Sequence, residues 1–198
     1  MEKFYLEKPA LQRKKEALEY IYEFFDNDSG IHGVGSLNKY IDDYEGWLRF
    51  VEANWNRPVT DTWVPSHTYF LIRKSDDRIV GMIDIRLALT EFLKKYGFNI
   101  GYSIRPSERG KGYNKINLYL GLQVCAQYGL KEVYLDADLD NPASWKTMEA
   151  LGGIRIREHI DEDDSTNVMV DYVIDVVKSL EEHKEEFAPY VNEEGKVK

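Results

Sequence analysis

Hydrophobic residues recur along this chain with two different periods, and each period predicts a different kind of element. Over residues 11–25 apolar side chains return at the spacing of one helical face, which predicts a first helix. A second, aromatic helix is predicted from Ile41 through Trp47 to Val51. The stretch between these helices is rich in Gly, Asn, Asp and Ser, which is typical of a loop.

Two short runs with strand character follow. Residues 68–74 and 78–87 are separated by Ser-Asp-Asp, a turn composition, so they predict a β-hairpin. Side chains alternate between the two faces of a strand. In the second run this alternation predicts one face with Ile79, Gly81, Ile83 and Ile85, and another with Val80, Met82, Asp84 and Arg86. The second face therefore carries charge.

The second half of the chain alternates strands and helices. Helices are predicted at 115–128 and 141–153, and strands at 98–105, 131–138, 154–160 and 167–177. Gly129 suits the end of the first helix, and Asn141 with Pro142 suits the start of the second. This order predicts an α/β (α+β) fold. The acidic stretch after residue 178 predicts a terminal helix that frays into disorder.

Length and composition favour one folded, soluble domain. The chain has 198 residues, 43% of them hydrophobic and 31% charged, which is enough to bury a core. We expect a single domain over residues 1–190 and a disordered tail over 191–198. No apolar run approaches the roughly 20 residues of a membrane helix, and the N-terminus lacks the apolar part of a signal peptide. We therefore expect a cytoplasmic protein that does not contact membranes.

Charge, cysteine and histidine content limit which partners, disulfides and metal sites the chain can have. The net charge of −9 disfavours a nucleic-acid partner, because binding to phosphates needs a basic surface, and it is compatible with a cationic partner. The single cysteine, Cys125, excludes an internal disulfide and a cysteine-based zinc site. The four histidines lack the spacing of a metal site, so we expect no metal.

One turn carries a candidate binding site. It runs Arg109, Gly110, Lys111, Gly112, Tyr113, Asn114 between a predicted strand and a predicted helix. Backbone N–H groups at such a turn, together with the helix dipole, form an anion cradle that glycines leave open to a phosphate. Basic residues at Arg105, Arg109, Lys111 and Lys115 add positive charge against a single Glu108. An ordinary solvated turn is also compatible with this short pattern.

The run from Gly101 to Gly153 resembles the Gcn5-related N-acetyltransferase (GNAT) superfamily, and the resemblance extends over about residues 68–176. The family signature Q/R-x-x-G-x-G/A matches Arg109 and Gly112, with Asn114 at the last position. The family's next helix commonly begins N-x-x-A/S, as Asn141 to Ser144 do here. The resemblance implies a mixed, mostly antiparallel central sheet, with splayed strands around the coenzyme A site and helices on both faces.

The resemblance also implies acetyl-coenzyme A as the co-substrate. Its pyrophosphate would rest on the backbone amides of the turn, which are those of Gly110, Lys111, Gly112, Tyr113 and Asn114, next to Arg109. Its pantetheine arm would lie along Tyr102, Ser103 and Ile104 and touch Asn141 and Ser144. The acceptor side would be built by residues 10–66 and the coenzyme A-binding core by residues 67–176. Lys146 is either a contact for a coenzyme phosphate or a solvated lysine.

Three positions depart from the family pattern. Asn114 replaces a small residue at the start of the helix. Met148 stands where members often carry a tyrosine acid, and Phe98 and Asn99 stand near the position of a glutamate base. The general acid that would protonate the departing thiolate therefore has no assigned residue, and the general base is not found at its usual position.

Candidates for the base are Asp84 first, then His67, Asp136 and Asp138. The competing interpretation of Asp84 is an ion pair with Arg86, two residues along the same face. The competing interpretation of His67 is a solvated loop histidine.

These observations favour an N-acetyltransferase that moves an acetyl group to a primary amine by direct attack. Acidic residues near the first loop favour a positively charged acceptor. We expect a small-molecule amine as the acceptor, and a homodimer is left open. One alternative is a non-catalytic acyl-coenzyme A-binding module, which the missing acid and base would explain. Another is an α/β interaction protein whose basic turn binds some other phosphate.

Overall fold

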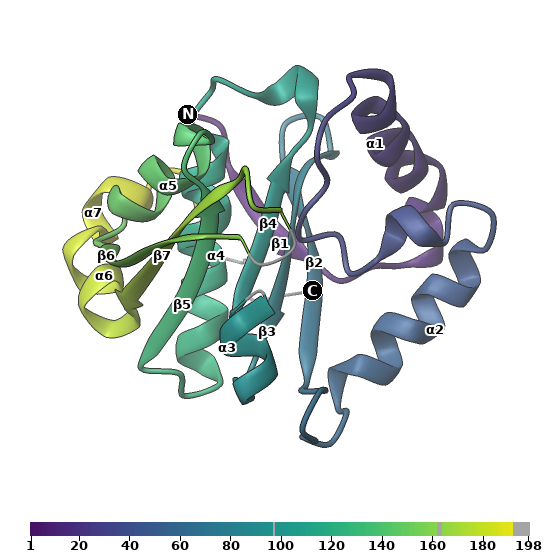
Figure 1. The fold of residues 1–198 in the computed structure, drawn as a ribbon. Helices are drawn as coiled ribbons and strands as arrows, with labels where there is room; N and C mark the ends of the chain where they lie inside the picture. The colour runs from purple at the N-terminus through teal and green to yellow at the C-terminus, as the bar shows by residue number, and fades with distance from the viewer. Residues whose placement is uncertain (97, 162–163, 192–198) are drawn as a thin grey trace.

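The computed structural model describes residues 1–96, 98–161 and 164–191 (Figure 1). The first sheet has the order β1-β2-β3-β4, with β1 (Phe4–Glu7), β2 (Ser66–Arg73), β3 (Arg78–Arg86) and β4 (Ile100–Ile104). The second sheet has the order β5-β7-β6, with β5 (Glu132–Asp138), β6 (Ile154–Ile160) and β7 (Val168–Asp175). Neighbouring strands within each sheet are antiparallel.

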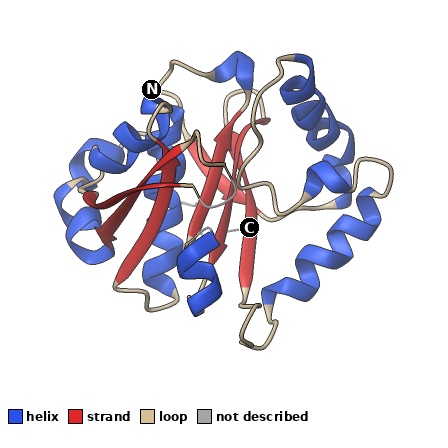
Figure 2. Cartoon of the chain, in the orientation of Figure 1, coloured by secondary structure: helices blue, strands red, loops and turns tan. Residues whose placement is uncertain are grey.

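Helices cover both faces of the strands. They are α1 (Lys14–Asp26), α2 (Tyr44–Trp55), α3 (Glu91–Tyr96), α4 (Tyr113–Gln127), α5 (Pro142–Glu149), α6 (Val176–Glu182) and α7 (Lys184–Phe187). Short 3-10 turns add η1 (Leu11–Arg13), η2 (Leu37–Lys39) and η3 (Pro106–Glu108). In Figure 1, α1 and α2 lie at one side of the first sheet, and α5, α6 and α7 lie beside the second sheet. Figure 2 shows the same division between helices and strands. The expected fold class is confirmed.

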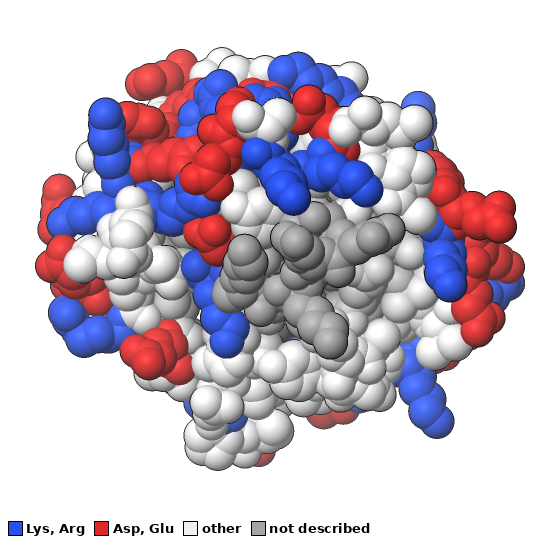
Figure 3. Space-filling model, turned by 180° about the vertical axis from the view of Figure 1, so that it is seen from behind, with Lys and Arg blue, Asp and Glu red and all other residues white. Residues whose placement is uncertain are grey.

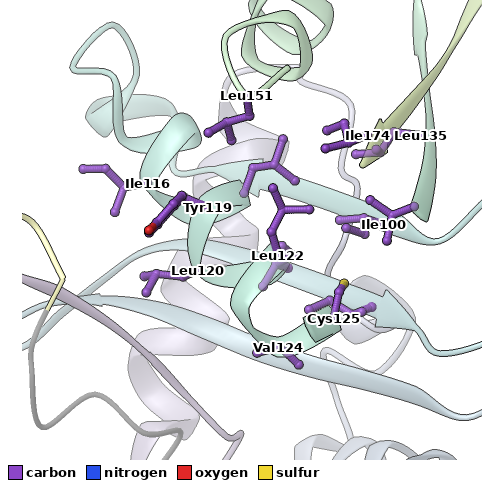
Figure 4. Packing of buried hydrophobic residues seen from close by; sticks show 14 of the residues in the cluster. Ile100, Ile116, Tyr119, Leu120, Leu122, Val124, Cys125, Leu135, Leu151 and Ile174 are labelled. Carbon is purple, nitrogen blue, oxygen red and sulfur yellow. The ribbon is translucent and has the colours of Figure 1, made fainter. Parts of the chain in front are cut away.

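Helix α4 packs against both sheets. Its residues Leu118, Leu122 and Cys125 are fully buried and belong to one cluster with Ile100 of β4 and Leu135 of β5. Figure 4 shows Cys125 beside Ile100. Apolar neighbours surround this helix on several sides, which is why its sequence has little amphipathic character. Cys125 is thus a packing residue of the core.

The structure corrects the face assignment on β3. Leu71 pairs with Gly81 while Ile72 pairs with Ile79, so Val80 is one extra residue in the strand. Such a β-bulge reverses the alternation of side chains beyond it. Val80 consequently joins the buried cluster around α4, and Ile79 joins the cluster beneath α1 and α2, the reverse of the expected arrangement.

Several boundaries also differ from expectation. Strand β1 and helix α3 are absent from the predicted elements, since a four-residue strand and a six-residue helix carry too few periodic positions. Helix α2 begins at Tyr44 instead of near Ile41, because the Asp43 side chain caps it by accepting from the Gly46 N–H at 2.8 Å. The terminal helix is present as α6 and α7, and Val191 bridges to Phe4. The rest of the expected disordered tail, residues 192–198, lies outside the described residues.

Several exposed charges form ion pairs, for example Lys14 with Glu45 and Lys178 with Glu182. On the face in Figure 3, acidic and basic side chains are interspersed over the upper part and the edges, and the lower part is mostly uncharged. Among the described residues, no helix has both the length and the apolar character that a bilayer crossing requires.

The two sheets meet at one residue pair. The Asn99 N–H donates to the Tyr134 carbonyl oxygen at 2.9 Å, and the Asn99 Oδ1 accepts from the Tyr134 N–H at 2.9 Å. The Asn99 Nδ2 also donates to the carbonyl of Arg86 on β3 at 3.0 Å. Beyond this pair, no strand pairing joins β4 to β5 within the described part of the chain. The strands therefore part from Asn99 onward, as the expected splay requires.

Replacing the side chain at this junction tests its role. We expect Asn99→Ala to lower the free energy of unfolding by about 1–3 kcal/mol for each backbone group that loses its partner, because Asn99 is 3% exposed and water cannot readily replace the amide. Urea denaturation measures this loss. Stability equal to wild type would show that the junction does not depend on this side chain.

Candidate functional site

The glycine turn that the sequence singled out connects β4 to α4. After η3, the chain reaches α4 through residues 109–112. Gly110 and Gly112 have φ of +76° and +78°, in the left-handed region that glycine adopts without strain. Apart from the adjacent residues in the chain, no atom of the described residues lies within 4 Å of the position that a Cβ would take at either glycine. The outer surface of the turn is therefore open to a ligand.

Backbone N–H groups of this turn suit an anion. Gly112 is the N-cap of α4, and the first N–H groups of a helix have no carbonyl partner inside that helix. The helix dipole adds about half a positive charge at the same end. The turn thus has the geometry of an anion cradle.

Glu108 anchors the turn from the inside. Its carboxylate is 3% exposed and lies 2.7 Å from Arg73 Nη1, 3.3 Å from Arg78 Nη1 and 2.7 Å from Lys111 Nζ. Burial raises the pKa of Glu108, but the contacts with Arg73 and Lys111 outweigh burial, so this pKa lies below its ordinary value. The sequence alone assigned Glu108 only an opposing charge. In the structure Glu108 is buried, and its ion pairs with Arg73, Arg78 and Lys111 hold the turn in place.

The basic residues near the turn do not all face it. Arg105 is buried, and its Nη1 lies 3.5 Å from Glu23 on α1, so the expected contribution of Arg105 to the anion site is wrong. Arg109 reaches in the same direction, because its Nη2 donates to Ser29 Oγ at 2.8 Å. Lys115 is exposed. The open backbone, more than these side chains, is therefore the feature of the turn that suits an anion.

Strand β4 has an edge that faces the split between the sheets. Ser103 turns away from this edge, since its hydroxyl donates to the His32 carbonyl at 2.6 Å and contacts the Tyr20 hydroxyl at 3.0 Å. Ile104 is buried in the core. The Tyr102 hydroxyl reaches the start of α5, where it lies 3.1 Å from Ser144 Oγ. Burial raises the pKa of Tyr102.

The start of α5 forms the opposite wall. Asn141 caps this helix by accepting from the Ser144 N–H at 3.3 Å, as expected. Asn114 at the start of α4 donates from Nδ2 to Thr147 Oγ1 at 3.4 Å, which links the two helices. The Asn114 Oδ1 is buried and has no hydrogen-bond partner among the described residues. A free acceptor therefore lies between α4 and α5, next to the glycine turn. Met148 is 1% exposed and packs in the core.

The loop before η2 lies directly on the sheet. A Cβ at Gly33 would stand 2.3 Å from the carbonyl oxygen of Gly101, and one at Gly35 would stand 2.3 Å from Thr68 Oγ1. Only glycines permit this approach, because any side chain there would collide. The sequence analysis missed this role, although the Gly-x-Gly spacing within a loop is the signal that could have indicated it. The loop covers a row in which Thr68 pairs with Asp84 and Asp84 with Gly101.

Asp84 is on the side of the sheet that this loop covers. Its Oδ1 accepts from the hydroxyls of Ser66 and Thr68 at 2.7 Å each, and its Oδ2 accepts from Ser66 at 2.8 Å. Both residues lie on the neighbouring strand β2. No ion pair joins Asp84 to Arg86 within the described residues, so the competing interpretation from the sequence does not hold. The expected role of Asp84 as a base stays a prediction.

The other candidate bases differ in exposure. His67 is 1% exposed, its ring stacks on Trp55 at 3.7 Å between centroids, and its Nε2 donates to the Trp55 carbonyl. This histidine belongs to the core, contrary to the solvated loop residue that the sequence suggested. Asp138 accepts from Asn167 Nδ2 at 2.8 Å. Asp136 is partly buried on β5, and burial raises its pKa, with a further increase from Asp171.

No group of three or more histidine, cysteine, aspartate or glutamate side chains in the described parts of the chain has the geometry to hold a metal ion. Phe98 and Asn99 are both buried, and Asn99 forms the junction of the sheets.

Comparisons with known proteins add to this geometry. Residues 34–152 match the model of the Acetyltransferase (GNAT) family. RimJ of Mycobacterium smegmatis, in complex with CoA-disulfide, has a TM-score of 0.67 and 13% identity over 91% of this chain and 89% of that chain. The microcin C7 self-immunity acetyltransferase MccE, in complex with acetyl-CoA and AMP, has a TM-score of 0.62 and 18% identity over 87% of this chain and 92% of that chain.

Mutant forms of the spermidine/spermine N-acetyltransferase SpeG from Vibrio cholerae have a TM-score of 0.62 and 12% identity over 91% of this chain and 98% of that chain. These likenesses show a shared fold. A search of curated proteins finds no match to the sequence.

The burial of His67 predicts a pH dependence of stability. Burial lowers the pKa of His67 below the ordinary value of about 6.5, so the unfolded chain takes up a proton at a higher pH than the folded chain does. The stability contributed by the neutral ring is therefore complete above about pH 6.5 and is lost as the pH falls below it. Urea denaturation at several pH values measures this loss. As the pH falls, the free energy of unfolding should decline less steeply for His67→Gln than for wild type. Parallel declines would contradict this role.

Proposed function

The chain belongs to the acetyltransferase (GNAT) family, and on that premise we propose that it transfers an acetyl group from acetyl-coenzyme A to a primary amine by direct attack in a ternary complex. The observation that carries the proposal is the open glycine turn at the start of α4 beside the split between β4 and β5. One feature offers backbone donors to a phosphate, and the other leaves a gap in which a thioester can meet an acceptor.

Binding of the coenzyme pyrophosphate is assigned to the backbone N–H groups of residues 110–114, beside Arg109. The open space around Gly110 and Gly112 supports this assignment, because phosphate oxygens must approach the backbone closely. A structural neighbour crystallised with acetyl-CoA adds support from the fold.

The pantetheine arm is assigned to the gap between β4 and α5. The β4 edge at Tyr102, Ser103 and Ile104 would form one wall through its backbone, and Asn141 and Ser144 would form the other. The buried and unpartnered Asn114 Oδ1 fits this arm, since pantetheine carries amide N–H groups that need acceptors. The departure of Asn114 from the family pattern thus has a use in this chain.

The acceptor amine is assigned to the other side of the split, beneath the loop that packs on Gly101. Residues 10–66 would build this side and residues 67–176 the coenzyme core. Carboxylates on β3 and β5 suit a cationic acceptor, and a neighbour named as a spermidine/spermine N-acetyltransferase agrees with an amine. Asp84, the base that the sequence favours, faces this side of the sheet, but both of its oxygens already accept hydrogen bonds from Ser66 and Thr68.

Catalysis would come mainly from orientation. An unprotonated amine held against the thioester needs no covalent intermediate, and backbone N–H groups at the edge of β4 would polarise the carbonyl. Cys125 is fully buried, and burial raises its pKa to about 12, which keeps it a thiol at neutral pH. This residue is therefore no candidate for an acyl-enzyme.

The phosphate assignment is tested by charge at the turn. Gly112→Glu places a carboxylate where the pyrophosphate would bind, and we expect calorimetry to show acetyl-coenzyme A affinity falling at least about tenfold because of charge repulsion. The matched control is Gly112→Ala, which carries the same strain at φ +78° without the charge. Equal affinities for the two variants would show that the pyrophosphate does not bind at this turn.

Turnover is tested by release of coenzyme A thiol with a panel of primary amines. We expect at least one amine to release the thiol, with initial-rate lines that intersect, because direct transfer needs both substrates bound together. Binding of acetyl-coenzyme A without release by any amine would favour the non-catalytic module. Parallel lines would favour an acyl-enzyme.

A further inference from the structure

Two carboxylates flank the point where the sheets separate. Asn99 and Tyr134 are paired across the junction, and Gly101 and Asp136 each stand two residues further along their strands. The crossover helix α4 joins β4 to β5, as it does between parallel neighbours. Asp136 therefore lies across the split from Gly101. Asp84 pairs with Gly101 from the opposite side, on β3.

The face to which Asp136 belongs is the acceptor side. Its strand neighbours Leu135 and Ala137 point into the core around α4, so the alternation of the strand turns Asp136 to the other face. On this face Gly33 rests against Gly101, and the same loop carries the exposed His32. Asp136 is thus a carboxylate beneath the loop, beside the gap assigned to the thioester.

The surroundings of the two carboxylates differ. Both oxygens of Asp84 accept hydrogen bonds from the hydroxyls of Ser66 and Thr68. For Asp136, no side chain in the described part of the chain donates a hydrogen bond to the carboxylate. Asp84 is therefore bound to its own sheet. The Asp136 carboxylate has a backbone hydrogen bond from its own residue, and its remaining lone pairs are available to a ligand.

A second carboxylate stands behind Asp136. Asp136 pairs directly with Asp171 on β7, and Asp171 is 2% exposed. Arg157 Nε lies 2.6 Å from Asp171 Oδ2, and His159 Nδ1 lies 3.7 Å from Asp171 Oδ1. The ion pair with Arg157 compensates the cost of burying the Asp171 carboxylate. A second carboxylate, held in place by Arg157, therefore faces Asp136 from the neighbouring strand.

Charges from three further elements act on Asp136. Burial is the largest cause of its raised pKa, and Asp171 adds to it, while Arg86 on β3 and His32 in the loop act in the opposite direction. The charge of Asp136 in turn raises the pKa of Tyr102 on β4. Because its pKa is raised, the Asp136 carboxylate is a stronger base than an ordinary aspartate, and its place beside the gap between the strands suits it to accept a proton.

We propose that Asp136 is the catalytic residue that accepts the proton of the acceptor ammonium, and that Asp171 is its positioning residue. This inference rests on the proposed acetyl transfer. Asp136 takes one proton from the ammonium and later releases it to water. The nitrogen lone pair then forms the C–N bond, the C–S bond breaks with its electron pair on sulfur, and the second N–H proton reaches the thiolate through water. The products are the acetamide and coenzyme A.

Four variants compared with the wild type separate Asp136 from Asp84. With an amine that the wild type acetylates, we expect Asp136→Asn to lower kcat by about 10² to 10⁴, with acetyl-coenzyme A affinity unchanged. Asp136→Glu should recover part of the rate, because it restores a carboxylate. Asp84→Asn should lower kcat less than about tenfold and leave the pH profile in place. The matched control is Glu132→Gln, an exposed acid on the same strand and face, which should match the wild type.

The pH profile tests Asp171. Removing its negative charge in Asp171→Asn should lower the pKa of Asp136, since Asp171 raises it, and the acid limb of kcat against pH should move to lower pH. A purely structural role would lower the rate at every pH without moving this limb. Carbon-13 NMR of labelled aspartate side chains should show the same shift of the Asp136 titration without any substrate.

The outcomes separate the two proposals. A wild-type enzyme that releases no thiol with any amine overturns the proposed function. An active wild type with an unaffected Asp136→Asn overturns the assignment of Asp136 alone. The same holds if Asp84→Asn carries the larger loss, or if NMR finds Asp136 titrating in the ordinary aspartate range.

Discussion

The paired hydrogen bonds between Asn99 and Tyr134 determine how the two sheets are arranged. Each residue donates a backbone N–H, and one of the two acceptors is the Asn99 side chain, so this contact ends the pairing of β4 with β5 instead of extending it. Beyond it the strands separate, and the edge of β4 faces a gap. A continuous sheet would satisfy more backbone groups but would leave no place for a substrate between the strands. The split is therefore the feature on which both proposed binding sites depend.

A second constraint keeps the glycine turn in place at one end of this gap. Helix α4 is buried against both sheets, which fixes the direction of its N-terminus, and Glu108 connects the preceding turn to Arg73, Arg78 and Lys111. The turn itself carries no side chain at Gly110 and Gly112. Ion pairs and packing thus hold the turn from behind, while its outer side is left as bare backbone. This division suits a ligand that is recognised through backbone N–H groups.

The acceptor side depends on close backbone contact. Gly33 and Gly35 bring their loop directly onto β4 and β2, where a side chain would collide with Gly101 or Thr68. Beneath that loop the carboxylates of Asp84 and Asp136 differ in environment although both are partly buried aspartates on strands. Hydroxyl donors surround Asp84, and a second acid faces Asp136. Identical side chains thus acquire different chemistry from their neighbours.

The sequence by itself determined the features whose cause is local. The strands and helices of the second half, the cap at Asn141 and the turn between Arg109 and Asn114 follow from contacts within a few residues, and a glycine at positive φ needs no distant partner. Only the tertiary structure decided the bulge at Val80, the direction of Arg105 and the junction at Asn99. It also decided the pairing of Asp136 with Asp171. Each of these depends on the register between strands or on the partner of a charge far along the chain, and one-residue changes in register move a side chain to the opposite face.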